Sequence, residues 1–475
     1  MNILKDGSNW NYAAYASRLV YEEEGKLRSG VEFEVTDFKR VSAFLTRDRN
    51  ASESNQKEEY SSLLYHYLEY GPENTEFYQK KLAYFGNGKE TYYLTVWFNE
   101  SAEADQIELT SWYYIQEGED YDCYAQSFVE SDGYVTAKCS IKAMRQEENL
   151  TLGTLFQLKT HDGNKQQSAE GRLDAISKDT LFFGTNIYYV GAALCVGLYS
   201  AQYRPRLGCW VPNRIEGYFD FGISSGNGSH NVYVQGKAAA ANANLAAILA
   251  DLVSQPDKII IISHWHKDHI SIARHILSAT YDSFWARSSW YVPYSASPAS
   301  NVVADKLRAL GGSIKVLPNS NPAVNTVYKI SNNNNLTYGK IDAFTDPHPH
   351  HHGIYAKIKL VDLTGEEFET MLLAGDCTYS GIPTAQKASV SYLQACHHGG
   401  DYALPPSTGN RTVHIPVPKN DPTYRSVFYS ANGVTHGHPN ATFAWEHTAA
   451  GWTKPYITHL APNGGKFWVN HYDVT

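Results

Sequence analysis

The stretch His264-Trp265-His266-Lys267-Asp268-His269 brings three imidazoles and a carboxylate into one short turn. It follows Lys258–Ile262 (KIIII), a β-branched run without a helical period that is typical of a buried strand. A strand that ends in a loop rich in metal ligands can fix a metal on a rigid support. The sequence therefore predicts a metal site at the end of this strand.

The spacing inside this stretch indicates two ions. His264 and His266 lie two positions apart on an extended segment, so their side chains point to the same side and can bind one ion. Asp268 and His269 come from the next turn and can bind a second ion close by. Carboxylate oxygen and imidazole nitrogen together suit Zn, Mn or Fe, and the sequence does not choose among these metals.

Two later junctions repeat the pattern of an apolar strand followed by ligand residues. Met371–Ala374 is followed by Gly375, which lets the backbone turn, and by Asp376, which could bridge both ions. Taken alone, a Gly-Asp pair is more typical of an ordinary turn. Val390–Ala395 then leads into Cys396-His397-His398-Gly399-Gly400. The recurrence of the pattern in one chain favours the functional interpretation.

Together these residues resemble the metallo-β-lactamase fold, whose signature is HxHxDH, a bridging Asp and a late His. The resemblance covers residues 181–475 and implies an α/β fold, the αββα sandwich, for that part of the chain. Ile187–Leu198 resembles the opening strand of the family, although the glycine-rich VGQG turn of the related branch reads Val190-Gly191-Ala192-Ala193 here. Tyr218–Gly222 resembles the early Asp-Gly turn, which gives Asp220 a supporting role.

The branch that looks closest contains the hydrolase domain of the competence protein ComEC and the phosphorylcholine esterases. That branch shows His-His-Gly after the bridging Asp and a later Gly-His-Pro, which match His397-His398-Gly399 and Gly437-His438-Pro439. The middle His ligand of the family falls within Asp346–His352, which holds four histidines. We favour His350 or His352 as a ligand, and an exposed His run is the alternative.

The resemblance implies a hydrolase that uses a hydroxide shared by two divalent ions, Zn or Mn. The expected metal ligands are His264, His266, Asp268, His269, His350, His352, Asp376 and His397. His264, His266 and His397 would hold the first ion, Asp268 and His269 the second, and Asp376 both. The expected catalytic residues are Asp268, His398 and His438. His398 would contact the substrate, with the roles of His397 and His398 left open, and Asp268 or His438 would protonate the leaving group.

The substrate expected from the branch is a small-molecule or nucleotide-type phosphodiester. The metal motif alone would equally fit a carboxyl-ester, lactone or β-lactam hydrolase. A different class of interpretation is a metal-stabilised sensor or binding protein, in which residues 1–180 recognise a protein partner.

Residues 1–180 differ in amino-acid composition from the rest of the chain, because they are rich in Tyr and Glu and contain only two histidines. Lys57–Tyr70 reads as a helix, and three segments alternate apolar and polar residues like strands of an antiparallel sheet. These segments are Tyr92–Phe98, Gln106–Ile115 and Gly133–Ile141. We predict a smaller, β-rich accessory domain over residues 1–180 and a hydrolase domain over 181–475.

Composition excludes several function classes. A net charge of −9 and the lack of a basic run interleaved with aromatics argue against a strong nucleic-acid-binding surface. No apolar run is long enough to span a bilayer, and the N-terminus lacks the pattern of a signal peptide. The six cysteines show no CxxC spacing and fit reduced thiols. We therefore expect a cytoplasmic enzyme.

Overall fold

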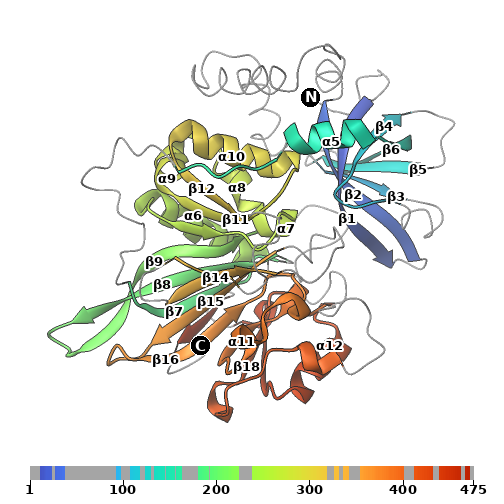
Figure 1. Ribbon diagram of the computed structural model, residues 1–475. Helices are drawn as coiled ribbons and strands as arrows, with labels where there is room; N and C mark the ends of the chain where they lie inside the picture. The colour runs from blue at the N-terminus through green and yellow to red at the C-terminus, as the bar shows by residue number, and fades with distance from the viewer. Residues whose placement is uncertain are drawn as a thin grey trace. The chain divides into compact units, whose positions relative to one another are not determined.

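The computed structural model of the 475-residue chain describes residues 11–23, 27–37, 93–97, 107–117, 123–129, 133–144, 146–155, 157–162, 180–191, 193–223, 238–317, 326–330, 335–341, 353–400, 411–431, 438–461 and 466–470 (Figure 1). The chain forms two compact units. Unit 1 comprises Met1–Lys159 and Ser295–Leu310, and unit 2 comprises Thr160–Tyr294 and Gly311–Thr475. The domain boundary at residue 180 stays a prediction. Within the described ranges, no helix is both long and apolar enough to cross a membrane.

Unit 1 contains a closed β-barrel. Its strands are β1 (Asn11–Glu23), β2 (Leu27–Asp37), β3 (Tyr93–Trp97), β4 (Trp112–Glu117), β5 (Cys123–Val129) and β6 (Gly133–Ala143). They pair antiparallel in the order β1-β2-β3-β5-β6-β4. The strands predicted over Tyr92–Phe98 and Gly133–Ile141 are confirmed, whereas the strand predicted over Gln106–Ile115 begins only at Trp112. The predicted helix Lys57–Tyr70 lies outside the described residues.

The described residues of the same unit also form the helices α5 (Gln146–Leu155) and α10 (Pro298–Leu310). The first turn of α10 is held by a side chain from β2, because the Ala299 N–H donates to Glu34 Oε2 over 3.0 Å. Glu34 is 2% exposed, and its burial raises the pKa of the carboxyl group to about 7.

Unit 2 is a mixed α/β unit whose described residues form a 14-stranded sheet. Its strands are β7 (Phe182–Tyr188), β8 (Cys195–Arg204), β9 (Cys209–Phe221), β10 (Ile259–Ile261), β11 (Ser289–Pro293), β12 (Ser313–Leu317), β13 (Val327–Lys329), β14 (Leu336–Lys340), β15 (Ile354–Val361), β16 (Glu367–Leu373), β17 (Tyr392–Gln394), β18 (Ser426–Tyr429), β19 (Lys454–Ile457) and β20 (Lys466–Asn470). Their order is β12-β11-β10-β9-β8-β7-β15-β16-β17-β18-β19, with β14 and β20 pairing β15 and β7 and β13 pairing β14.

The direction of the strands changes across this sheet. The strands β9 to β12 run parallel at one end, and β16 to β19 run parallel at the other. Nearer the centre, the hairpins β7–β8, β8–β9, β14–β15 and β15–β16 are antiparallel, and β7 and β15 pair in parallel. The segments Ile354–Leu363 and Phe368–Ala374, which flank the polar turn Thr364–Glu367, predict a hairpin from sequence, and β15–β16 confirms it.

One buried cluster extends along the sheet from one end to the other. Ile259 and Ile261 on β10 belong to the same buried cluster as Phe428 on β18, although many strands separate them in the sheet order. A second buried cluster contains Tyr355 and Leu372, from the opposite face of β15 and β16. Both faces of these strands are therefore covered.

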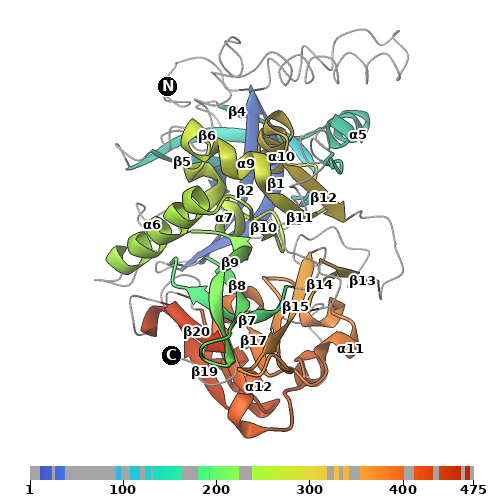
Figure 2. The same cartoon turned by 90° about the vertical axis from the view of Figure 1, so that its left-hand side faces the viewer.

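Helices flank the two ends of the sheet (Figures 1 and 2). The helices α6 (Ala238–Ser254) and α9 (Asp282–Arg287) lie beside β10 to β12. At the other end, α12 (Ala441–Ala449) lies close to β18 and α11 (Thr384–Lys387) nearby. The Ala-rich segment Gly236–Ser254 predicts a helix from its sequence, and α6 confirms it.

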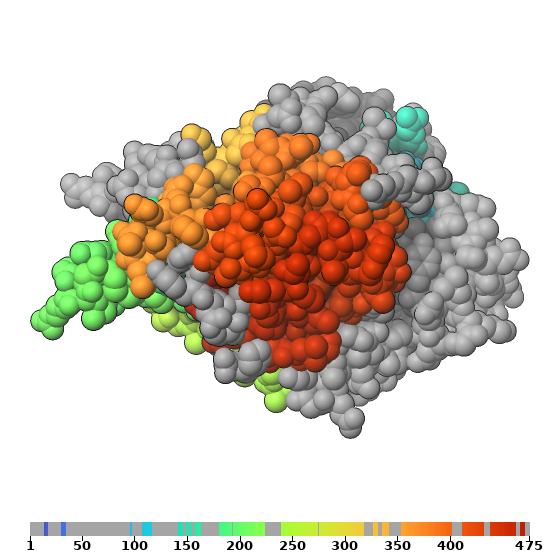
Figure 3. All heavy atoms as spheres, turned by 90° about the horizontal axis from the view of Figure 1, so that it is seen from below, coloured from blue at the N-terminus to red at the C-terminus, as the bar shows by residue number. Residues whose placement is uncertain are grey.

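The single strand predicted over Ile187–Leu198 is wrong, because this segment contains the end of β7 and the start of β8. Gly191 adopts φ 86° between them, a conformation that glycine adopts without strain. Residues on both sides of the turn are buried, so the apolar run carries no periodic signal that would reveal it. The outer ends of β8 and β9 extend beyond the rest of the sheet, seen in green in Figure 3.

Candidate metal centre

The HWHKDH turn lies at the carboxyl end of β10, which pairs in parallel with β9 and β11. His264, His266 and His269 are 1%, 5% and 0% exposed. The His269 N–H donates to the His266 carbonyl over 2.9 Å, where the short helix α7 (Lys267–Ile270) begins. Buried imidazoles need polar partners, so the surroundings of this turn determine what its side chains can do.

Asp220, at the end of β9, makes hydrogen bonds to both ends of the turn. Its Oδ1 accepts the Ser263 N–H over 2.6 Å, and its Oδ2 accepts the Ser263 hydroxyl over 2.7 Å. The same Oδ2 lies 2.7 Å from His269 Nδ1. A carboxylate in this position keeps the proton of His269 on Nδ1 and leaves Nε2 with a lone pair. His264 Nδ1 lies 3.0 Å from the Ser263 hydroxyl and is oriented in the same way.

Asp376 follows β16 through Gly375, which adopts φ 60°. A Cβ atom on Gly375 would lie 2.3 Å from Ser263 Oγ, so both the backbone conformation and the space require glycine. Gln394 on β17 secures this turn, because its Oε1 accepts the N–H groups of Ala374 and Gly375 over 3.0 and 2.7 Å. The loop that carries Asp376 is thus packed directly against the loop that carries the histidines.

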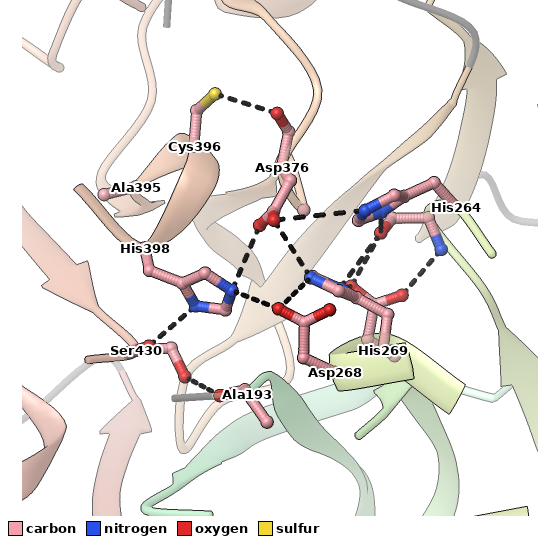
Figure 4. A network of polar contacts seen from close by, with 12 residues as sticks. Ala193, His264, Asp268, His269, Asp376, Ala395, Cys396, His398 and Ser430 are labelled. Carbon is pink, nitrogen blue, oxygen red and sulfur yellow. Dashed lines mark hydrogen bonds and ion pairs between the residues drawn. The ribbon is translucent and has the colours of Figure 1, made fainter. Parts of the chain in front are cut away.

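His398 reaches the same place from the carboxyl end of β17 (Figure 4). It follows His397 in a turn in which both residues are left-handed, with φ 50° at His397 and 53° at His398. His398 Nδ1 lies 2.7 Å from the carbonyl of Ser430, and only the N–H form of Nδ1 can donate to a carbonyl. The Ser430 hydroxyl in turn donates to the carbonyl of Ala193. As in His269, the hydrogen bond at Nδ1 leaves Nε2 of His398 on the opposite side of the ring, pointing away from Ser430.

The Nε2 atoms of His269 and His398 face the carboxylates of Asp268 and Asp376. His269 Nε2 lies 3.2 Å from Asp376 Oδ2, and His398 Nε2 lies 3.4 Å from both Asp376 Oδ1 and Asp268 Oδ2. One donor atom from each of Asp268, His269, Asp376 and His398 lies within 4.8 Å of the others. Two imidazoles and two carboxylates are a donor set that divalent transition metals accept, so this group could hold a metal ion.

The first two histidines of the motif border this group. His264 Nε2 lies 3.9 Å from Asp376 Oδ2. The ring centroids of His264 lie 4.3 Å from those of His266 and 4.1 Å from those of His269. Asp376 therefore belongs to the four-residue group and also lies beside His264.

The charges of the site compensate one another. Burial alone would lower the pKa of His269, but Asp376, Asp220 and Asp268 outweigh it and raise the pKa well above its usual value. Burial would likewise raise the pKa of Asp376, but His269 and His398 hold it well below the ordinary range. A divalent ion would supply the positive charge that protons otherwise supply here, since metal and protons compete for the same nitrogens.

The fit of the group to a metal can be tested on His398. Burial lowers its pKa, but Asp376 and Asp268 raise it above the ordinary value overall. Its Nε2 lies 3.4 Å from both Asp268 Oδ2 and Asp376 Oδ1. A buried imidazole nitrogen that faces two carboxylates fits a metal ligand, because imidazole and carboxylate are common ligands of the same divalent ion.

Other predicted residues lie elsewhere or outside the described ranges. The sequence favoured His397 over His398 as the ligand, and the geometry reverses this choice, since only His398 joins the four-residue group. The left-handed turn sends His397 toward His438 instead, with ring centroids 5.2 Å apart. His350 and His352, like the other histidines of 348–352, lie outside the described residues.

Sequence reasoning missed the residues that hold the ligands. Ser263, Gln394 and Ser430 each bond a ligand residue or its loop, and all three are 0% exposed. A polar residue such as Gln394 within an otherwise apolar strand is a signal that could have identified them, because a buried amide must find partners.

No model of a protein family matches the chain, and no curated protein matches it. The functional argument therefore depends on the residues of the chain itself.

Proposed function

We propose that this chain is a metal-dependent hydrolase of the metallo-β-lactamase type, which cleaves phosphodiesters. The observation that supports it is the convergence of Asp268, His269, Asp376 and His398 within 4.8 Å. Their segments follow β10, β16 and β17 and are distant in sequence, so the group is not a chance cluster of neighbouring surface residues. Sites at the carboxyl ends of parallel strands are typical of enzymes.

The proposed αββα sandwich is supported by the core. Both faces of the central strands are buried, and helices lie beside each end of the sheet, which fits a sandwich of two sheets between two helical layers. The loops after β10 and after β16 and β17 would then meet at one edge of the sandwich, where the ligand residues are found.

Bound divalent ions supply Lewis acidity and a nucleophile at neutral pH. In this proposal Asp268, His269, Asp376 and His398 would hold one ion, and His264 and His266 would contribute to holding a second. Asp220 keeps the proton of His269 on Nδ1, and the Ser430 carbonyl does the same for His398.

The open side of the site is marked by Asp268. Its side chain is 18% exposed, whereas those of Asp376 and His398 are 3% and 6% exposed. A substrate therefore approaches from the side of Asp268, where this carboxylate can hold a proton for the leaving group. His438 lies beside His397 and is the second candidate for this proton transfer.

The test combines metal analysis with hydrolysis. We expect the purified chain to bind divalent metal and to hydrolyse bis-p-nitrophenyl phosphate with Mn or Zn, and Asp376→Asn to lose both properties. The control is Glu366→Gln, an exposed carboxylate in the β15–β16 turn. A wild-type chain without affinity for metal would refute the proposal.

Two other results would favour a different function. Turnover of p-nitrophenyl acetate or a lactone alone would replace the phosphodiester with a carbonyl substrate. Metal binding without any turnover, with biological effects that survive Asp376→Asn, would favour the sensor interpretation.

A further inference from the structure

A buried pair outside the proposed ligand set, Tyr379 and His447, lies beside the turn that carries His398. Both are almost fully buried, at 0% and 1% exposed. Tyr379 comes from the loop that carries Asp376, and His447 lies near the end of α12. None of the roles argued above uses either residue.

The hydrogen bonds of the pair run in one direction. His447 Nδ1 lies 2.8 Å from the carbonyl of Phe443, so Nδ1 carries the proton and Nε2 has the lone pair. The Tyr379 hydroxyl, 3.0 Å from Nε2, therefore donates to it. The Tyr379 oxygen then accepts the N–H of Cys396 over 2.9 Å. Burial lowers the pKa of His447 to about 4, so the imidazole is a neutral acceptor at neutral pH.

The other end of the same turn is also bound to α12. The carbonyl of Gly399 accepts the N–H of Asn440, over 3.0 Å. Asn440 is the N-cap of α12, since its Oδ1 accepts the Thr442 N–H. The two hydrogen bonds, at Cys396 and at Gly399, thus enclose the left-handed residues His397 and His398.

Two successive non-glycine residues in the left-handed conformation are unfavourable, and such a turn persists only when its surroundings impose it. We infer that Tyr379 and His447 are positioning residues that clamp this turn and so aim Nε2 of His398 into the metal group. This inference rests on the proposed function. Without the clamp, the turn relaxes to negative φ values and His398 leaves the ligand position.

The experiment measures cobalt(II) affinity of the full chain after chelation of resident metal. Tyr379→Phe removes the hydroxyl that accepts from Cys396, and we expect about tenfold weaker cobalt binding with an altered ligand-field spectrum. The matched control is Tyr392→Phe, which removes another buried hydroxyl, one that donates to the carbonyl of Asn470. It should bind cobalt like the wild type.

A pair of variants at the imidazole separates positioning from packing. His447→Gln keeps an acceptor for the Tyr379 hydroxyl and should retain most of the affinity, whereas His447→Ala should lose about as much as Tyr379→Phe. Equal cobalt affinity in wild type and Tyr379→Phe would overturn the inference alone, as would an equal loss in Tyr392→Phe. A wild type that binds no cobalt would overturn the proposed function and this inference with it.

Discussion

Replacing Asp220 with Asn tests whether the site is built to direct imidazole nitrogens at a metal. Asp220 adopts φ 53°, a conformation that Asn tolerates well, so the backbone should be retained. The Asn oxygen can still accept the Ser263 N–H. Its NH₂ group then faces His269 Nδ1, where a donor now meets a donor. His269 must move its proton to Nε2, and a protonated nitrogen cannot bind a metal.

The magnitude follows from the bond that is lost. A hydrogen bond to a charged group contributes about 1.5–3 kcal/mol, and removing such a support of a ligand costs about 10–100-fold in metal affinity. We therefore expect the zinc affinity of Asp220→Asn, measured by competition with a chromophoric chelator, to fall within that range. The fold should persist, as judged by circular dichroism.

The control is Asp251→Asn, which also neutralises a partly buried carboxylate in unit 2. Asp251 accepts the Tyr218 hydroxyl over 2.6 Å and pairs with Lys258 at 3.0 Å, and neither partner belongs to the four-residue group. It should lower stability and leave zinc affinity unchanged. Unchanged affinity in Asp220→Asn, or an equal loss in both variants, would refute the argument that Asp220 sets the tautomer of His269.

Gly375→Ala should destabilise the chain more than Gly208→Ala in urea denaturation. Both glycines have positive φ, which costs alanine about 1–2 kcal/mol. Only at Gly375 would the added Cβ also clash, with Ser263, whereas a Cβ at Gly208 would meet open space. Equal losses would contradict the close packing of the two ligand loops. Glu34→Gln should stabilise unit 1 by roughly 3 kcal/mol near pH 8 and by less than about 1 kcal/mol near pH 5. The pKa of Glu34 is raised in the folded state to about 7, so the stability it contributes is present in acid and lost as the pH rises through 7, and Gln does not ionise. Hydrogen exchange of the helix that begins beside Ala299, measured at both pH values, checks this, and parallel pH profiles would contradict it.

The sequence was sufficient to find the members of the candidate metal group that follow strands closely. His264 to His269 follow β10, and Asp376 follows β16 after Ala374 and Gly375. The apolar strand and the polar loop are both visible in the sequence. Parallel strands then bring such loops to the same edge of a sheet, so the convergence of distant segments can be expected from local patterns.

The choice between His397 and His398 could not be made in this way. The two residues are adjacent and identical, and only the backbone conformation decides which one enters the group. That conformation is left-handed at both positions, which local propensity disfavours for histidine. It depends on bonds from Tyr379 and Asn440, which are distant in sequence. The turn is thus determined by tertiary contacts.

The orientation of the rings distinguishes a metal group from an ordinary buried polar network. In an ordinary network, each buried imidazole would satisfy both nitrogens with hydrogen-bonding groups of suitable polarity. Here Nδ1 of His269 and of His398 is fixed by Asp220 and by the Ser430 carbonyl, while both Nε2 atoms face Asp376. In each ring, Nδ1 is bound by a hydrogen-bond acceptor and Nε2 faces carboxylate oxygens. Only a positive charge between Nε2 and these oxygens can satisfy both, and either protons or a metal ion can supply it. Protons can fill this position, because nearby carboxylates raise the pKa of both imidazoles, and a divalent ion would compete with these protons for the same nitrogens.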